Sequence, residues 1–231
     1  MDLAFLFDID GTLLKIQNKA NRMVIQQILD QYGLREMDVR NIDFAGKTDR
    51  DIFTALLDNP GEELFERVKH TYLNELDRQL VPDDIHVFGG VHPALEFLNK
   101  YNARVGILTG NFSKAAHIKL ELSGLDHYFE FGAFGDDSSD RNELPPAAHR
   151  KLQKFTGVPF QPSNMVIIGD TPRDIRCAQS FGAISIAVAT GGYSADELSR
   201  FQPDMVLESL HTLPEWVEQF CNITPGRSVS D

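Results

Sequence analysis

The sequence has few cysteines and no long hydrophobic run. Its 231 residues include two cysteines, Cys177 and Cys221, which lack the spacing of a metal site. Two isolated cysteines favour a reducing compartment over a secreted domain held by disulfides. The apolar run at residues 3–7 is too short for a signal-peptide core or a membrane span. We therefore expect a cytoplasmic protein with no membrane partner.

Positive charge is also scarce. The chain has 22 Lys and Arg residues against 34 Asp and Glu, for a formal net charge of -12 at pH 7. Such a balance disfavours nucleic acid and anionic membranes as partners, although a small anion can still bind at a local positive site. With 42% apolar residues, the chain is long enough to bury a full core. Composition does not separate a monomer from a homodimer.

Short apolar runs alternate with segments of helical periodicity. Each run ends in small or acidic residues, as buried parallel strands do; the runs are residues 3–7, 104–108, 165–168 and 184–188, with a weaker candidate at 129–133. Helices are expected between them, at 91–101, 113–123 and 172–181. Alternating strands and helices predict an α/β fold, a Rossmann-like doubly wound parallel sheet covered on both faces.

The segment from 16 to 86 interrupts this alternation. It contains only helical patterns, in which apolar residues such as Val24, Ile28 and Tyr32 share one face. We therefore predict two domains. Residues 1–15 and 87–231 form the Rossmann-like core, and residues 16–86 form an inserted all-helical subdomain.

The strongest chemical signal follows the first strand, in the string Phe7-Asp8-Ile9-Asp10-Gly11-Thr12. Asp8 and Asp10 are two residues apart, so both are expected to project from the carboxyl edge of the sheet, where open α/β sheets bind ligands. Two close carboxylates repel unless a cation such as Mg²⁺ lies between them. One can attack phosphorus while the other transfers a proton. A capped turn is the structural alternative.

Two further strands end in polar residues. Thr109, Gly110 and Asn111 follow residues 104–108, where a hydroxyl and backbone amides can bind phosphate oxygens at a helix N-terminus. An ordinary helix start explains these three residues equally well. Asp170 follows the strand at 165–168 and can complete a carboxylate set around a metal ion. Asp174 is either part of that set or an acid that caps the next helix.

Together, these motifs resemble the haloacid-dehalogenase (HAD) superfamily, and the phosphoglycolate phosphatases in particular, over nearly the whole chain. The resemblance implies a Mg²⁺-dependent phosphatase, with Asp8 as nucleophile, Asp10 as general acid and base, and Thr109 as a phosphate ligand. It implies a metal site formed by Asp8, the Asp10 carbonyl, Asp170 and Asp174. It also implies that the 16–86 insertion is a helical cap.

The sequence departs from the family pattern in the third motif. The family has a lysine there, whereas this chain has Asp140-Arg141-Asn142 before two prolines. We expect Arg141 to take the role of the lysine, because a guanidinium can neutralise both nucleophile and phosphate. The alternatives are a surface ion pair of Arg141 with Asp136, Asp137 or Glu143, and Lys119 as the catalytic cation.

The insertion contains the polar loop Gly46-Lys47-Thr48-Asp49 between two helices. In the family, a loop at this place closes over the site, so Lys47 is expected to bind an anionic or hydroxylated part of the substrate. Thr48 and Asp51 have the spacing of a helix cap. A solvated loop that begins a helix is the alternative.

The expected function is hydrolysis of small phosphorylated metabolites through an aspartyl-phosphate. A phosphosugar mutase of the same superfamily and a non-catalytic binding protein on the same scaffold are the alternatives. Dehalogenation does not need Asp10 or the metal set. Phosphonate cleavage would need a cap lysine, for which Lys47 is the only motif-like candidate.

Overall fold

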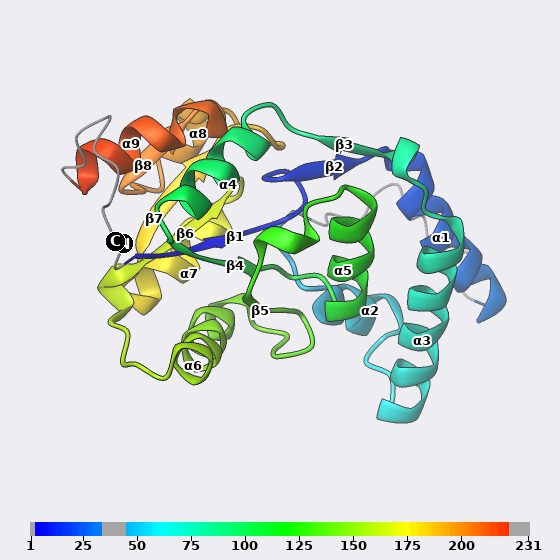
Figure 1. The fold of residues 1–231 in the computed structure, drawn as a ribbon. Coiled ribbons are helices and arrows are strands. Elements are labelled where there is room, and N and C mark those ends of the chain that lie inside the picture. The colour runs from blue at the N-terminus through cyan, green and yellow to red at the C-terminus, as the bar shows by residue number, and fades with distance from the viewer. Residues whose placement is uncertain (1–2, 34–44, 222–231) are drawn as a thin grey trace.

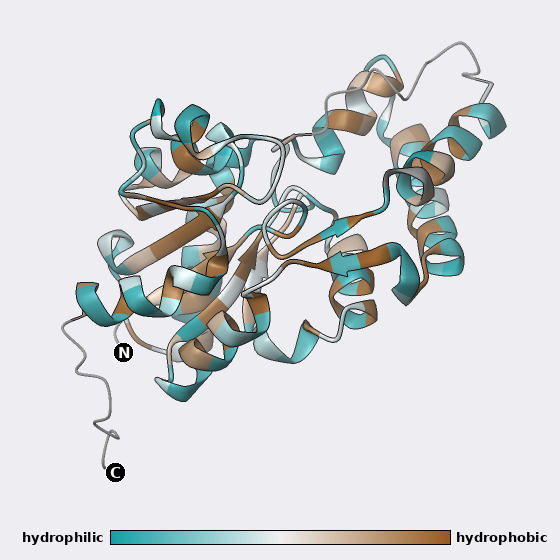
Figure 2. Ribbon diagram, turned by 90° about the horizontal axis from the view of Figure 1, so that it is seen from above, coloured by the Kyte–Doolittle hydropathy of each residue, from teal (hydrophilic) through white to brown (hydrophobic). Residues whose placement is uncertain are grey.

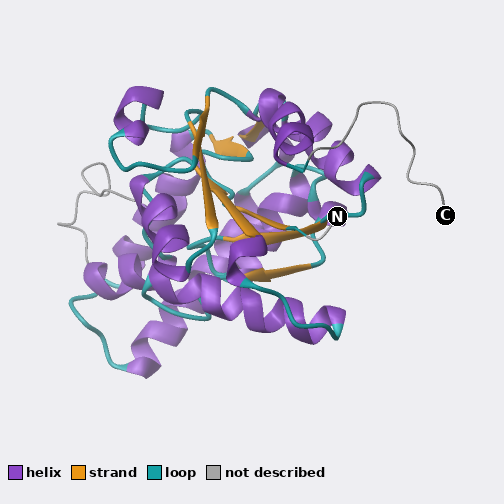
Figure 3. Cartoon of the chain, turned by 90° about the vertical axis from the view of Figure 1, so that its left-hand side faces the viewer, coloured by secondary structure: helices purple, strands orange, loops and turns teal. Residues whose placement is uncertain are grey.

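A six-stranded parallel sheet forms the centre of the computed structural model, which describes residues 3–33 and 45–221. The strand order is β5-β4-β1-β6-β7-β8, and all neighbours are parallel. Helices cover both faces of this sheet (Figure 3). The predicted doubly wound α/β fold is therefore confirmed. The strands are β1 (Ala4–Phe7), β4 (Arg104–Leu108), β5 (Phe131–Ala133), β6 (Met165–Gly169), β7 (Ile184–Val188) and β8 (Met205–Leu207).

The first strand shows why the sheet is buried on both faces. Phe5 and Phe7 belong to one apolar core, and Ala4 and Leu6 belong to the other. Because successive strand residues point to opposite faces, a strand with helices on both sides must be apolar at every position. All four residues have no exposed surface.

Two groups of helices flank the sheet. The core on the Phe5 side includes buried residues of α4 (Val91–Lys100), α5 (Ser113–Leu122) and α9 (Leu213–Phe220). The core on the Leu6 side includes residues of α6 (Leu144–Thr156) and α7 (Pro172–Phe181). The short α8 (Ala195–Ser199) packs near β7 and β8. Figure 1 shows α4 and α6 on opposite sides of the strands.

The predicted strands and helices are confirmed to within about two residues at each end. The weak candidate at 129–133 is the short strand β5. Sequence patterns missed β8, because its three residues, Met205–Leu207, lie at the sheet edge and only Leu207 is buried. In residues 3–33 and 45–221, no helix has both the length and the apolar character needed to cross a membrane.

Three helices lie beyond the carboxyl ends of the strands: α1 (Asn18–Gln31), α2 (Asp49–Leu56) and α3 (Glu62–Gln79) (Figure 1). In Figure 2 the ribbons of these helices carry both apolar and polar segments. Their buried apolar residues, among them Ile28, Phe53 and Tyr72, belong to one core cluster. The division of the chain into a core and a cap stays a prediction.

An antiparallel ribbon joins these helices to the sheet. It consists of β2 (Leu14–Ile16) and β3 (Ile85–Val87), in which Ile16 pairs with Ile85. The sequence analysis expected only helices in residues 16–86 and did not predict this strand pair. The ribbon carries the chain from the carboxyl edge of β1 into the helices and back.

Candidate active site

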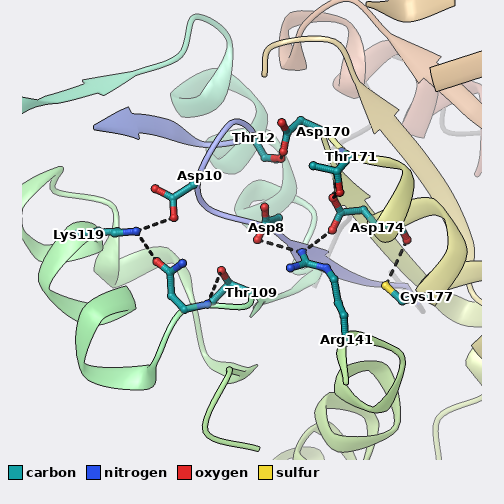
Figure 4. Close-up of polar contacts among 11 residues, drawn as sticks. Asp8, Asp10, Thr12, Thr109, Lys119, Arg141, Asp170, Thr171, Asp174 and Cys177 are labelled. Carbon is teal, nitrogen blue, oxygen red and sulfur yellow. Dashed lines mark hydrogen bonds and ion pairs between the residues drawn. The ribbon is translucent and has the colours of Figure 1, made fainter. Parts of the chain in front are cut away.

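The residues that directly follow three neighbouring central strands lie close together. Asp8 follows β1, Thr109 follows β4 and Asp170 follows β6. Phe7 is in register with Ile107 on one side and Ile168 on the other, so the three strands end at the same level. Figure 4 shows Asp8 between Thr109 and Asp170. The parallel register thus brings together polar residues that are far apart in the sequence.

Three buried carboxylates form a cluster at this edge. Each of Asp8, Asp170 and Asp174 offers an oxygen, and these oxygens lie within 4.8 Å of one another. The carboxylate of Asp174 also accepts hydrogen bonds from the backbone N–H and hydroxyl of Thr171, at 3.1 and 2.6 Å. Asp174 is therefore both the helix-capping acid and a member of the cluster. Only oxygen ligands are present here, as Mg²⁺ and other hard divalent ions prefer.

Arg141 is the cation in this cluster. Its Nη2 lies 3.1 Å from Asp8 Oδ1, and it also forms an ion pair and hydrogen bond with Asp174 Oδ1. The alternative of a surface ion pair is wrong, since Arg141 is buried while Asp136 pairs with Lys69 and Asp137 pairs with Lys151. The guanidinium therefore contacts two of the three clustered carboxylates.

Burial and mutual repulsion alter the acidity of these groups. Burial raises the pKa of Asp8 to about 6, with Arg141 opposing the shift and Asp174 adding to it. Burial, with the charges of Asp174 and Asp8, raises the pKa of Asp170 to about 8. Burial lowers the pKa of Arg141, but the negative charges of Asp174 and Asp8 raise it by more, so the pKa of Arg141 stays above its usual range. One cation does not compensate three carboxylates, so the cluster fits a divalent ion.

The metal-free protein is expected to lose stability as pH rises from 5 to 8. Asp8 and Asp170 have raised pKa values in the folded state, about 6 and about 8, so folding retains protons that the unfolded chain has released. A divalent ion held by these carboxylates would take the place of those protons, so Mg²⁺ should raise the Tm more at pH 8 than at pH 5. Thermal melts with Mg²⁺ or with EDTA at both pH values test this.

Substitution of Asp170 provides the control for that measurement. Asp170→Asn should remove most of the pH slope and of the Mg²⁺ effect, whereas the exposed Asp126→Asn should keep both. A Tm that responds equally to Mg²⁺ at the two pH values would contradict the metal site.

Asp10 lies outside the carboxylate cluster. Its Oδ2 is 2.5 Å from the Nζ of Lys119, which also donates to Asn111 Oδ1 at 2.5 Å. The side chain of Lys119 is 2% exposed and that of Asp10 is 41% exposed. The two cations that the sequence offered as alternatives are therefore both present, Arg141 at Asp8 and Lys119 at Asp10 (Figure 4).

The loop after β4 is held close to the insertion. The backbone N–H of Asn111 donates to Thr109 Oγ1 at 3.3 Å. A Cβ at Gly110 would lie 2.2 Å from the carbonyl oxygen of Lys47, so only glycine fits here. Thr109, Gly110 and Asn111 all line the pocket that contains Asp8.

The turn after β1 also requires glycine. Gly11 has a φ of 93°, and a Cβ there would lie 2.3 Å from Asp170 Oδ2. The hydroxyl of Thr12, the next residue, donates to Asp170 Oδ1 at 3.4 Å. Thr190, which no sequence pattern indicated, donates to the carbonyl oxygen of Gly11 at 2.6 Å. Both Gly11 and Thr12 of this turn therefore contact the Asp170 carboxylate.

Gly11→Ala is expected to lower kcat/KM by about 100-fold, because the added methyl group displaces the Asp170 carboxylate and a shift of about 1 Å is enough for such a loss. Gly192→Ala is the matched control. Gly192 lines the same pocket, but its Cβ would meet nothing within 4 Å. Steady-state kinetics of the two variants should differ by more than tenfold; equal effects would show that the turn is not critical.

The 46–49 loop is bound to the sheet edge. Asp49 N donates to Gly110 O at 2.7 Å, and Asp49 Oδ2 accepts from Phe112 N at 2.8 Å. The hydroxyl of Thr48 accepts from Asp51 N at 3.1 Å and donates to Ser139 O at 2.9 Å. The expected cap by Thr48 is confirmed. The loop thus connects the insertion to the loop after β4.

A pocket of about 570 Å³ contains these groups. Residues from the sheet edge form one part of it, and residues from the ribbon, α1 and the 46–49 loop form the other. The first part includes Asp8, Asp10, Thr109, Lys119, Arg141, Asp170 and Thr190; the second includes Lys15, Asn21, Arg22, Lys47, Asp49, Ile52 and Phe88.

Carboxylates clustered at the carboxyl edge of a parallel α/β sheet lie where open α/β enzymes bind their ligands, and they suit a divalent ion. Residues 5–188 match the family model described as haloacid dehalogenase-like hydrolase. The chain therefore belongs to the haloacid dehalogenase-like hydrolases, and the expectation of a hydrolase enzyme of this family is confirmed.

Relatives of known name span nearly the same length. Pyrophosphatase PpaX of Oceanobacillus iheyensis is 24% identical over 205 residues, covering 89% of this chain and 92% of that protein. A predicted phosphoglycolate phosphatase from Haemophilus somnus has a TM-score of 0.71 at 19% identity, covering 94% and 98% of the chains. A β-phosphoglucomutase from Clostridium difficile also has a TM-score of 0.71, at 20% identity with coverage of 96% and 98%. Structural likeness at this identity shows the fold alone.

Proposed function

We propose that the protein is a Mg²⁺-dependent phosphatase that hydrolyses small phosphorylated metabolites through an aspartyl-phosphate on Asp8. The observation that carries this proposal is the buried cluster of Asp8, Asp170 and Asp174 with Arg141 paired to Asp8. Three buried carboxylates around one arginine suit phosphoryl transfer, which needs a divalent ion and positive charge beside the nucleophile. The name of the sequence relative, pyrophosphatase, supports the same class of reaction.

The residues divide the reaction into two transfers. In the first, a carboxylate oxygen of Asp8 forms a bond to phosphorus while the bond to the leaving oxygen breaks and Asp10 gives that oxygen a proton. In the second, Asp10 takes a proton from water as the water attacks phospho-Asp8 and frees Asp8 and orthophosphate. The ion pair with Lys119 holds the carboxylate of Asp10 in the pocket.

Other groups bind the phosphoryl group. Thr109 and the backbone amides of Gly110 and Asn111, which line the pocket with Asp8, are proposed to bind its oxygens. Arg141 neutralises charge at Asp8 and is a preorganised donor for the phosphate that arrives there. Lys47 lines the same pocket and is proposed to bind the remainder of the substrate.

The carboxylates of Asp8, Asp170 and Asp174, with the main-chain carbonyl of Asp10, would hold Mg²⁺. A divalent ion supplies positive charge that offsets the repulsion between Asp8 and the phosphate. Asp174 also fixes Arg141, so its loss is expected to affect both the metal site and the guanidinium.

A screen of phosphorylated metabolites with Mg²⁺, run beside an Asp8→Asn control, tests the proposal. We expect one substrate to be preferred, orthophosphate to be released and EDTA to stop the reaction. Transfer of the phosphoryl group to a second sugar in place of water would instead indicate the mutase. Binding of a phosphorylated compound without turnover would indicate the non-catalytic protein.

A further inference from the structure

Three cationic residues from separate elements line the pocket that contains Asp8. Lys15 belongs to β2, Arg22 to α1, and Lys47 to the loop before α2. Two apolar residues, Ile52 and Phe88, line the pocket with them. Three separate elements thus bring positive charge into the same pocket as Asp8, in a chain whose net charge is -12.

The cations at the sheet edge differ from these in their partners. Arg141 is paired with Asp8 and Asp174, and Lys119 is paired with Asp10. Within residues 3–33 and 45–221, neither Lys15 nor Lys47 has a carboxylate within the 4.0 Å of an ion pair. Two lysines of this pocket therefore carry charge that the described residues leave uncompensated.

Asp49, an acid that lines the same pocket, is already engaged. Asp49 accepts from the backbone N–H of Phe112, which ties the carboxylate to the sheet side of the pocket. Burial raises the pKa of Asp49 to about 6, against the opposing charge of Lys119. Asp49 thus does not cancel the positive charge of Lys15 and Lys47.

We propose that Lys15, Arg22 and Lys47 form a second anion subsite that binds the leaving group of the substrate. This inference rests on the proposed phosphatase function, because it requires the phosphoryl group to lie at Asp8. The substrate class is then a small phosphate compound whose leaving group carries its own carboxylate or phosphate. Charge-assisted hydrogen bonds to such a group are stronger than those to a neutral one.

A matched pair of substrates tests the subsite. Phosphoglycolate and 2-hydroxyethyl phosphate have the same two-carbon leaving group, which ends in a carboxylate in the first and a hydroxyl in the second. We expect kcat/KM with Mg²⁺ to be at least tenfold higher for phosphoglycolate. Pyrophosphate is the third substrate to be compared. A higher kcat/KM for pyrophosphate than for phosphoglycolate indicates that the subsite binds a phosphate, and a higher kcat/KM for phosphoglycolate indicates that it binds a carboxylate.

Single substitutions locate the effect. Lys15→Gln and Lys47→Gln should each lower the ratio of kcat/KM for the anionic substrate over 2-hydroxyethyl phosphate by about tenfold. Lys154→Gln changes the net charge equally at an exposed position of α6, outside the pocket, and should leave the ratio unchanged. A wild-type enzyme that hydrolyses both compounds with equal efficiency would overturn the subsite and leave the phosphatase standing.

Binding separates this inference from the proposed function. Phosphonoacetate and 2-hydroxyethylphosphonate are the matched unreactive ligands, since their C–P bonds resist phosphate-ester hydrolysis. Calorimetry of the wild-type protein with Mg²⁺ should give at least tenfold tighter binding of phosphonoacetate, and Lys15→Gln should remove that difference. If no ester is hydrolysed but phosphonoacetate still binds at least tenfold more tightly, the proposed phosphatase function is wrong and the anion subsite stands. Equal affinity for the two ligands overturns the subsite.

Discussion

Asp8→Asn is expected to lower kcat by about 10⁴-fold or more, the loss seen when a catalytic nucleophile is removed. Asparagine keeps the volume of the side chain and can accept the hydrogen bond from Arg141, but its amide cannot form the covalent intermediate. The measurement is release of p-nitrophenol from p-nitrophenyl phosphate with Mg²⁺. Mass spectrometry after a rapid quench should detect a phosphorylated wild-type chain and an unmodified variant.

The fold of the variant provides the control. Removal of one carboxylate lowers the repulsion among Asp8, Asp170 and Asp174, so the metal-free Tm of Asp8→Asn should equal or exceed that of the wild type. Asp126→Asn, at an exposed site in the loop after α5, should leave kcat unchanged. Activity of Asp8→Asn within tenfold of the wild type would reject Asp8 as the nucleophile.

Arg141→Met is expected to lower the metal-free free energy of unfolding by about 3–5 kcal/mol, because one partner of a buried ion pair is lost and the carboxylates remain. For a chain of this size, the Tm should fall by about 10 °C. Methionine fills much of the space of the arginine stem, so the decrease in the free energy of unfolding reflects the lost charge more than lost packing. Urea unfolding in EDTA measures the change.

Mg²⁺ and a matched variant make this result specific. Mg²⁺ should recover part of the stability of Arg141→Met, since it compensates the same carboxylates, but not its activity. Arg150→Met removes an exposed arginine of α6 and should change the Tm by less than 2 °C. A large gain of activity in Arg141→Lys over a nearly inactive wild type would favour the non-catalytic protein.

Sequence reasoning located the sheet and the ends of its central strands because those features are local. A strand such as Met165–Gly169 is apolar throughout, and the residue that follows it, Asp170, is polar and lies at the carboxyl edge. Parallel pairing then brings Asp8, Thr109 and Asp170 together without any knowledge of side-chain contacts. The carboxylate cluster was therefore predictable in outline.

The rest of the site depends on contacts between distant segments. Lys119 lies on α5 with the same spacing as a core residue, and only its approach to Asp10 gives it a role. Thr190 meets Gly11 across 179 positions of sequence, and Lys15 reaches the pocket from a ribbon that no periodicity indicated. The sequence posed Arg141 and Lys119 as competitors, since it could not show that each faces a different carboxylate.

The ribbon of β2 and β3 has an evolutionary consequence. Ile16 and Ile85 face each other across this strand pair, so the residues between them leave and rejoin the ribbon at adjacent points. A short hairpin turn could replace that entire segment, and a longer module could be grafted in its place, while every strand of the six-stranded sheet kept its neighbours. Substrate range can therefore diverge by exchange of a module while the chemistry at Asp8 is inherited unchanged.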